Sequence, residues 1–352
     1  SMYNGLASLR KGNLALSTDE MGGDGTIEFS GAELSSKDFV YSKDVFDADT
    51  SDFSLNSITE TGMAFRTENV SAHVSFIDRI GEFKANGDES FVEFPVNEYI
   101  CFMDKFNWYM DNNDIELETN RGKSVAESDF VIDTDVNKSS SNFFSTNEDQ
   151  DSLNFLSPRA VFNINTSIIR CEDIPFIKVA DAQIYPDSGK AIIRKHARID
   201  KLLNAGVLTN DVTKYHTIYN AEIEISSRFS YGGSGYIDYV DVSGKENQIW
   251  LKKIAVDTVY QTVAEGVILS DDAFMLSPFF EFQGDIDLEA DRQFLVFNGS
   301  TRILHDCPKE KQNWIPFTAE VDPEKILIPV PENVKSITGD LLASGRSEEH
   351  TS

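Results

Sequence analysis

The chain has two stretches in which a nucleophilic side chain lies beside other reactive groups. In YGGSGY, Ser234 stands between glycines, but Tyr236 occupies the position where the hydrolase pattern Gly-x-Ser-x-Gly requires glycine. In HDC, the neighbours His305 and Asp306 would point to opposite faces of a strand, and Cys307 follows them. We therefore predict a flexible turn at Ser234 and no catalytic residue in either stretch.

Two glycine-rich stretches resemble phosphate-binding loops in composition. GGDGTIE (22–28) and GGSGYID (232–238) do not complete Gly-x-Gly-x-x-Gly, and neither carries the lysine of a P-loop. We predict that both are turns, that no residue binds a cofactor and that the chain uses no cofactor.

Acidic residues could bind calcium. Asp133, Asp135 and Asn137 begin like a calcium loop. Lys138 stands where glycine is needed, however, and Phe144 stands where glutamate is needed. This stretch therefore fails as an EF-hand.

Further acids could supply oxygen ligands from loops, namely Asp47, Asp49, Asp52, Asp111 and Asp114. Solvated acidic turns explain them more simply. The histidines show no HxxxH or HxH spacing, so zinc has little support, and we predict no metal site. With 59 acids, any set of strands would offer a carboxylate pair, so such a pair does not indicate glycoside hydrolysis.

The three cysteines, Cys101, Cys171 and Cys307, lie far apart and have no CxxC spacing. They indicate neither a disulfide framework nor a redox compartment.

Aromatic residues gather in NEYICFMDKFNWYMDNND (97–114). Tyr99, Phe102, Phe106, Trp108 and Tyr109 could form a platform for sugar rings or for another apolar ligand. The alternative is a strand whose Phe106 and Trp108 face one side and whose Tyr109 faces the other. The alternation favours a structural core, and the platform remains the one candidate binding site.

The composition excludes some partners. The chain has 31 basic and 59 acidic residues, so its net charge is −28, which argues against nucleic acid and against docking on anionic lipid. Divalent cations, basic partners or simple solubility are compatible with that charge. No window approaches 18 consecutive apolar residues, so no transmembrane helix is predicted.

Short alternating runs dominate the sequence and predict an all-β fold. GTIEFSGAEL (25–34), SFVEFPV (90–96), NAEIEIS (220–226), GDIDLEA (284–290) and QFLVFNG (293–299) alternate apolar and polar residues between turn residues. ARIDKLLNAG (197–206) fits either a helix or a strand.

Two short phrases recur and suggest stacked units. Phe-x-Gly begins at Phe29, Phe282 and Phe297, so Gly284 and Gly299 are fifteen positions apart. Ala-x-(Ile, Leu or Val) begins at Ala32, Ala72, Ala182, Ala197 and Ala221. We predict an elongated stack of strands, a β-solenoid or a β-jelly-roll, with tandem β-sandwiches as the alternative.

The interpretation as stacked strands makes specific predictions about the repeated phrase. Phe282 should lie above Phe297 in successive units, with both rings buried. The glycines should lie where the backbone turns or where another strand passes too close for a Cβ atom. Asp285 and Asp287 should face solvent.

Composition also suggests how the chain is divided. Residues 133–152 are polar and acidic, so we expect a linker or long loop between a β-rich unit at 1–132 and a β-rich repeat unit at 153–340. RSEEHTS (346–352) is what a common sequencing adapter encodes in translation. The first twenty residues do not have the pattern of a signal peptide, and we expect the chain to be a fragment of a longer reading frame.

Three stretches, 71–118, 181–205 and 234–299, resemble very large envelope-associated proteins of Bacteroidota. The repeated Phe-x-Gly followed by alternating residues is also similar to the OstA-like β-jelly-roll of lipopolysaccharide-transport proteins. These resemblances imply a periplasmic or outer-membrane-associated location, with other envelope proteins, lipid or polysaccharide as partners. The OstA resemblance further implies a V-shaped stack of strands whose apolar interior holds acyl chains.

The leading hypothesis is therefore a non-enzymatic scaffold or assembly segment of a large envelope protein. The alternatives are an OstA-like lipid conduit and, third, a β-helix enzyme acting on polysaccharide. A conduit needs a continuous apolar groove, and an enzyme needs a cleft with carboxylates beside exposed aromatic rings or a cation.

Overall fold

The computed structural model describes residues 2–19, 21–58, 62–87, 90–121, 141–304, 312–328 and 333–342. Within these ranges the regular structure consists of strands and short 3-10 turns, η1 (Tyr3–Gly5), η2 (Glu148–Gln150), η3 (Asp187–Gly189) and η4 (Ser270–Asp272). The prediction of an all-β fold is confirmed. None of the helical turns in these ranges is long or apolar enough to cross a membrane.

The chain forms two compact units, which are considered separately. The first contains Ser1–Val179, Ile184–Leu202 and Glu224–Phe229. The second contains Ala180–Gln183, Leu203–Ile223 and Ser230–Ser352.

The expected linker at 133–152 is only partly described. Residues 141–152 belong to the first unit, where Phe143 on one strand lies opposite Cys101 and Phe155 on its two neighbours. The remainder of this segment and the C-terminal segment 346–352 lie outside the described residues.

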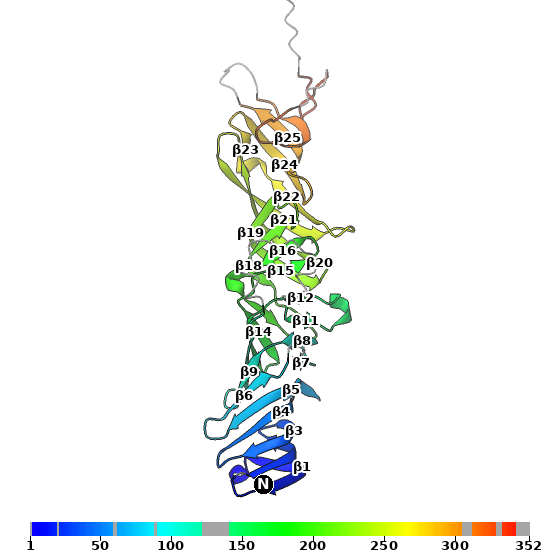
Figure 1. The fold of residues 1–352 in the computed structure, drawn as a ribbon. Helices are drawn as coiled ribbons and strands as arrows, with labels where there is room; N and C mark the ends of the chain where they lie inside the picture. Colours follow the sequence, from blue (N-terminus) through cyan, green and yellow to red (C-terminus); the bar gives the residue numbers. More distant parts are fainter. Residues whose placement is uncertain are drawn as a thin grey trace, which may run out of the picture. The chain divides into compact units, whose positions relative to one another are not determined.

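The first sheet has 15 strands in the described ranges, and these strands pair in antiparallel fashion (Figure 1). Its main path runs β1-β2-β3-β4-β5-β6-β9-β10-β13-β14-β17, and β7, β8, β11 and β12 branch from it. The strands are β1 (Ala7–Leu16), β2 (Met21–Phe29), β3 (Ala32–Tyr41), β4 (Val45–Asn56), β5 (Met63–Ser75), β6 (Ile80–Ala85), β7 (Phe91–Phe94), β8 (Tyr99–Phe102), β9 (Lys105–Tyr109), β10 (Asp114–Glu118), β11 (Phe143–Ser145), β12 (Asn154–Phe155), β13 (Arg159–Asn163), β14 (Ile168–Glu172) and β17 (Ala191–Ile193).

The branch begins at a fork in β5. Along one edge, Val70–Ser75 pairs with β6, whereas Arg66 and Thr67 pair with β7. Asn69 lies between the two pairings with a left-handed φ of 57°. Its N–H donates to the Asp52 carboxylate (3.1 Å), and its carbonyl accepts from the Ser90 hydroxyl (3.2 Å). These contacts satisfy the backbone groups that the fork removes from the ladder.

Aromatic rings fill the interior of the first unit. Phe83 stacks on Phe106 with ring centroids 4.4 Å apart, and Phe53 lies 4.5 Å from Phe83. Phe65 lies 5.1 Å from Phe106 and 5.5 Å from Phe94. All five side chains have at most 2 % of their surface exposed, so this core is closed to solvent.

The second sheet has 11 strands in the described ranges, in the order β15-β16-β18-β19-β20-β21-β22-β24-β25-β26, with β23 paired to β24. The strands are β15 (Ile177–Val179), β16 (Ala182–Tyr185), β18 (Leu202–Thr209), β19 (His216–Ser227), β20 (Ser230–Val240), β21 (Glu246–Val256), β22 (Thr262–Ile268), β23 (Phe274–Ser277), β24 (Phe280–Glu289), β25 (Val296–Ile303) and β26 (Ile315–Glu320).

Both glycine-rich stretches form strands, so the prediction of two turns, including the turn at Ser234, is wrong. GGDGTIE lies in β2 and GGSGYID lies in β20. A Cβ atom on Gly23 would lie 2.3 Å from the Asn13 carbonyl oxygen, and one on Gly233 would lie 1.9 Å from that of Glu222. Glycine is required here because a neighbouring strand passes very close, not because the chain turns.

The repeated phrase FFEFQGDIDLEADRQFLVFNG behaves partly as predicted. Phe282 and Phe297 are buried, and their rings meet edge to face at 5.1 Å. Gly284 lies directly opposite Gly299, and a Cβ atom on either would come within 2.6 Å of the other residue's Cα. The two strands are antiparallel neighbours rather than equivalent strands of successive units, which corrects the stacked-repeat prediction for this phrase.

The other copies of the phrases occupy dissimilar places. Phe29 ends β2, and the following Ser30 and Gly31 form a turn with positive φ, whereas Gly284 and Gly299 lie within strands. The ambiguous stretch 197–206 runs into β18, and Ile199 bridges to Ile193, so it adopts extended structure.

Candidate functional site

The five aromatic residues predicted as a binding platform do not form one surface. Tyr99, Phe106 and Trp108 are buried, with at most 1 % exposure. Tyr109 follows Trp108 on β9 and points to the opposite face, because successive residues of a strand alternate. Phe102 lies on β8, on the other limb of the fork. The burial of three of these five side chains agrees with the core alternative, and the other two rings are half-buried on different strands.

Those two rings have local partners. The Tyr109 hydroxyl donates to the Glu116 carboxylate on the neighbouring strand (3.1 Å). Phe102 has the ring of Phe91 at 5.8 Å, that of Phe144 at 5.7 Å and the Arg121 guanidinium at 4.7 Å. Tyr109 thus contacts the neighbouring strand β10, and Phe102 contacts both of its neighbouring strands, β7 and β11, and Arg121.

The outward face of the first sheet carries an ordered row of charges. Lys84, Lys105, Glu118, Arg159 and Glu172 are successive cross-strand partners on β6, β9, β10, β13 and β14. The inward residues next to them, such as Phe106 and Leu117, are buried. Strand alternation thus places the charges in register on one face and the apolar residues on the other.

Ion pairs join the members of this row. Lys105 Nζ lies 2.7 Å from Glu118 Oε2, and Arg159 Nε donates to Asp173 Oδ2 (2.7 Å). A hydrogen bond with Glu118 raises the pKa of Lys105, and one with Asp173 raises the pKa of Arg159. Both side chains are therefore held as cations and are unsuited to act as general bases.

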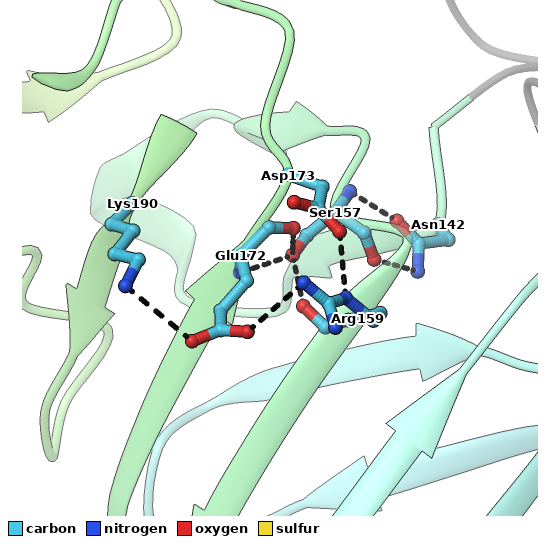
Figure 2. Close-up of polar contacts among 6 residues, drawn as sticks. All are labelled: Asn142, Ser157, Arg159, Glu172, Asp173 and Lys190. Carbon is cyan, nitrogen blue, oxygen red and sulfur yellow. Dashed lines mark hydrogen bonds and ion pairs between the residues drawn. The ribbon is translucent and has the colours of Figure 1, made fainter. Parts of the chain in front are cut away.

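A buried hydrogen-bonded contact between Asn142 and Ser157 lies beside these charges in the first unit (Figure 2). Asn142 Nδ2 donates to the Ser157 carbonyl (2.9 Å), and the Ser157 N–H donates to Asn142 Oδ1 (2.7 Å). The Ser157 hydroxyl oxygen also accepts the N–H of Glu172 (3.1 Å). Asn142 and Ser157 have at most 2 % exposure, so these bonds join the two limbs within the protein interior.

Figure 2 shows the exposed charges around this contact. Arg159 Nη2 lies 3.6 Å from one Glu172 oxygen, and Lys190 Nζ lies 3.8 Å from the other. One carboxylate therefore bridges two cations from different strands. The arrangement connects β13, β14 and the residue before β17.

A surface groove of about 530 Å³ lies beside Arg159. Among the described residues that line it, three are cations and three are carboxylates, so the formal charges of these residues balance. Its lining residues are Lys84, Asp104, Lys105, Glu118, Thr119, Asn120, Pro158, Arg159 and Asp173. Such a groove lacks the excess of one charge that would attract a charged ligand.

A second hollow, of about 620 Å³, lies at the fork of β5. It is bordered by Arg66, Thr67, Asn69, Ser90 and Phe91, among others. Arg66 forms an ion pair with Glu68 in this hollow. Phe91 is the one large apolar side chain among its described lining residues, although the surface that lines the hollow is more apolar than polar.

The acids predicted as solvated turns instead belong largely to strands. Asp47, Asp49 and Asp52 lie in β4, and Asp114 begins β10. Asp47 lies 2.6 Å from His73, and Asp114 accepts from the Asn163 amide (2.7 Å). Asp111, in a turn, pairs with Arg79.

Among the described residues, no three His, Cys, Asp or Glu side chains lie close enough together to hold a metal ion. Asp133, Asp135 and Asn137 lie outside the described residues, as do His305, Asp306 and Cys307.

The described thiols have no features of a nucleophile. Burial raises the pKa of Cys171 to about 12 and that of Cys101 well above its ordinary value. Both are therefore protonated at neutral pH, and a thiol rather than a thiolate is a poor nucleophile.

Sequence reasoning missed the charged row. Its members are separated by 13 to 41 residues in the chain, and only strand pairing brings them together. Part of it had a local signal: Arg159 and Glu172 flank two alternating runs, and hairpin pairing across the turn between them would have matched the two residues.

Comparisons with protein-family models, curated proteins and solved structures return no match for this chain.

Proposed function

We propose that the chain is a non-enzymatic scaffold or assembly segment of a large secreted or periplasmic envelope protein. The observation that carries this proposal is the closed interior of the first unit, in which rings such as Phe65, Phe83 and Phe106 contact one another and exclude solvent. A scaffold needs rigidity over many strands, and buried rings together with in-register ion pairs provide it. The envelope location rests on the sequence resemblance.

The polar surface supports the same proposal. The groove beside Arg159 is occupied by its own ion pairs, and the raised pKa values of Lys105 and Arg159 keep those groups charged. Acid–base catalysis needs a group that changes protonation near the working pH. These side chains are suited to holding strands together.

The test combines lipid loading with amide exchange on the full chain. We expect no saturable binding of the fluorescent fatty acid cis-parinaric acid, and strong protection of the amides of Phe106, Leu117 and Phe162 against hydrogen exchange. A conduit would bind the fatty acid stoichiometrically, and its interior strands would exchange faster as they open. Release of reducing ends from polysaccharide would overturn the proposal in favour of an enzyme.

A further inference from the structure

Two cross-strand rows on the outward face of the second sheet place aromatic rings next to hydrogen-bonding groups. Tyr236 of β20 lies directly opposite Trp250 of β21, and one step along the same face Asp238 lies opposite Gln248. Trp250 is 50 % exposed, and Tyr236 is half-buried. β19, β20 and β21 are consecutive neighbours in the sheet, so a third strand extends this face.

That third strand adds Tyr219. Its ring centroid lies 6.3 Å from that of Tyr236, and the ring planes differ by 28°, so the two rings lie nearly parallel. Tyr219 reaches the outward face beside an irregularity in β19: Ile218 and Ala221 are both buried, and Asn220 between them has a φ of 47°. One extra residue in a strand changes the direction in which the neighbouring side chains point, as β-bulges do near binding sites.

The polar row is connected to the rings. Gln248 Nε2 donates to the Tyr219 hydroxyl (2.8 Å), which in turn donates to the Asp238 carboxylate. The side chains of Asp238 and Gln248 are exposed and retain further hydrogen-bonding capacity. A ligand on the rings would therefore meet an acceptor and an amide at its edge.

The support beneath the rings is tight. A Cβ atom on Gly235, next to Tyr236, would lie 2.7 Å from Ile218 and 3.0 Å from Ala221. β20 therefore packs closely against the neighbouring strand β19, which restricts the motion of the backbone that carries the rings. A rigid platform loses little conformational entropy on binding.

We propose that Tyr219, Tyr236 and Trp250, with Asp238 and Gln248, form a binding surface for an uncharged polysaccharide. A pyranose ring has an apolar C–H face that matches the electron-rich face of an aromatic ring, and its hydroxyl groups project from the rim toward hydrogen-bonding partners. The net charge of −28 and the Asp238 carboxylate disfavour acidic polymers, which selects neutral sugars. This surface is independent of the scaffold proposal, because a scaffold need not bind sugar.

The test uses the full chain in affinity electrophoresis with hydroxyethylcellulose, laminarin and galactomannan, and with polygalacturonate as the acidic comparison. We expect retardation by at least one neutral polymer and none by polygalacturonate. Trp250→Ala and Tyr236→Ala should each weaken the binding by at least about tenfold, as removal of a central aromatic anchor does. Trp250→Phe should keep most of it.

Two controls separate recognition from misfolding. Phe279→Ala removes an aromatic ring that is 65 % exposed and lies outside the surface, so it should leave the affinity unchanged. In the unmodified chain, the bound polymer should shield Trp250 from acrylamide quenching, and Trp250→Phe should remove that effect.

The proposal fails if no neutral polymer binds, if polygalacturonate binds more tightly, or if Trp250→Ala binds as well as the unmodified chain. Concentration-dependent self-association that Trp250→Ala abolishes would instead identify a protein interface and overturn the sugar assignment.

Discussion

The two units differ in the aromatic rings and the charges that they expose on the outward faces of their sheets. In the first unit, Phe83 and Phe106 lie inside, and the outward row beside them alternates between cations and carboxylates from Lys105 to Glu172. In the second, Phe282 and Phe297 are buried as well, but Trp250 of β21 is 50 % exposed. Glu265 and Asp287, of like charge, are cross-strand partners on the outward face of the second sheet.

This difference separates stabilisation from recognition. A buried ring removes a large apolar area from water, whereas an exposed ring contributes little to folding and is available to a ligand. Likewise, cross-strand neighbours of opposite charge support their own strands, whereas Glu265 and Asp287 place two carboxylates side by side, with Lys253 paired to Glu265 alone. Comparisons of variants between the two units can test both statements.

The largest expected effect comes from emptying the ring core. Phe106→Ala should lower the free energy of unfolding by about 3–5 kcal/mol, because the cavity cannot be filled by its rigid ring neighbours. Trp250→Ala, the matched exposed ring of the second sheet, should cost about 0.5 kcal/mol or less. Urea denaturation of both variants measures the contrast, and equal losses would remove the distinction between the units.

A smaller effect should follow from enlarging a residue where strands approach closely. Gly233→Ala would press a Cβ atom against the Glu222 carbonyl, so we expect a loss of about 1–3 kcal/mol from overpacking. Gly87→Ala is the control, because a Cβ atom there meets open space, and it should change stability by less than about 0.5 kcal/mol. Urea midpoints within error of each other would show that β20 can move away from β19.

The like-charged pair predicts a pH effect. Burial, and then the charges of Asp285 and Glu265, raise the pKa of Asp287. The folded state therefore holds the proton more tightly than the unfolded state, and the ionised group opposes folding above its folded pKa. Asp287→Asn should consequently raise the melting temperature at pH 7.

That gain should shrink as the pH falls through the raised pKa and should disappear below the ordinary aspartate value, where both states are protonated. Thermal melts at pH 7 and at pH 3 measure it. A gain that persists at the lower pH would assign the effect to packing rather than to charge.

The smallest effect is expected at the paired row. Arg159 is largely exposed, and exposed ion pairs contribute little because water and salt screen them. Arg159→Ala should lower the melting temperature slightly in dilute buffer and not at all in molar sodium chloride. A loss that is unchanged by salt would indicate that the aliphatic stem, not the charge, supports the sheet.

The strands themselves were predictable, but their partners were not. GDIDLEA and NAEIEIS alternate because one face is buried, and both lie in strands of the second sheet. The fork in β5 left no local signal, since it depends on Asn69 being satisfied by Asp52 from another strand. An aspartate that resembled a calcium ligand in the sequence thus supports a backbone irregularity.

The glycine-rich stretches and the aromatic segment were also not fully predictable from the sequence. A run such as GGSG predicts a turn when only its own conformation is considered, yet Gly233 is needed because a neighbouring backbone passes close to it. The aromatic segment 97–114 showed which residues alternate but not which face is covered, and that depends on the opposing limb of the fork. Candidate sites therefore required pairing and burial, which local patterns do not contain.

The fork also imposes an order on folding. β5 pairs with β4 and with β6 through hairpins that close short loops. The pairing of β8 with β11 needs Phe143, which follows β9 and β10 in the chain. Contacts between distant residues form at a higher entropic cost. We therefore expect the meander β1–β6 to gain protection first in pulsed hydrogen exchange and the limb β7-β8-β11-β12 to gain it last, and simultaneous protection would contradict this order. During synthesis, the ring core would consequently remain open on one side until Phe162 of β13 packs against Phe65 and Phe94.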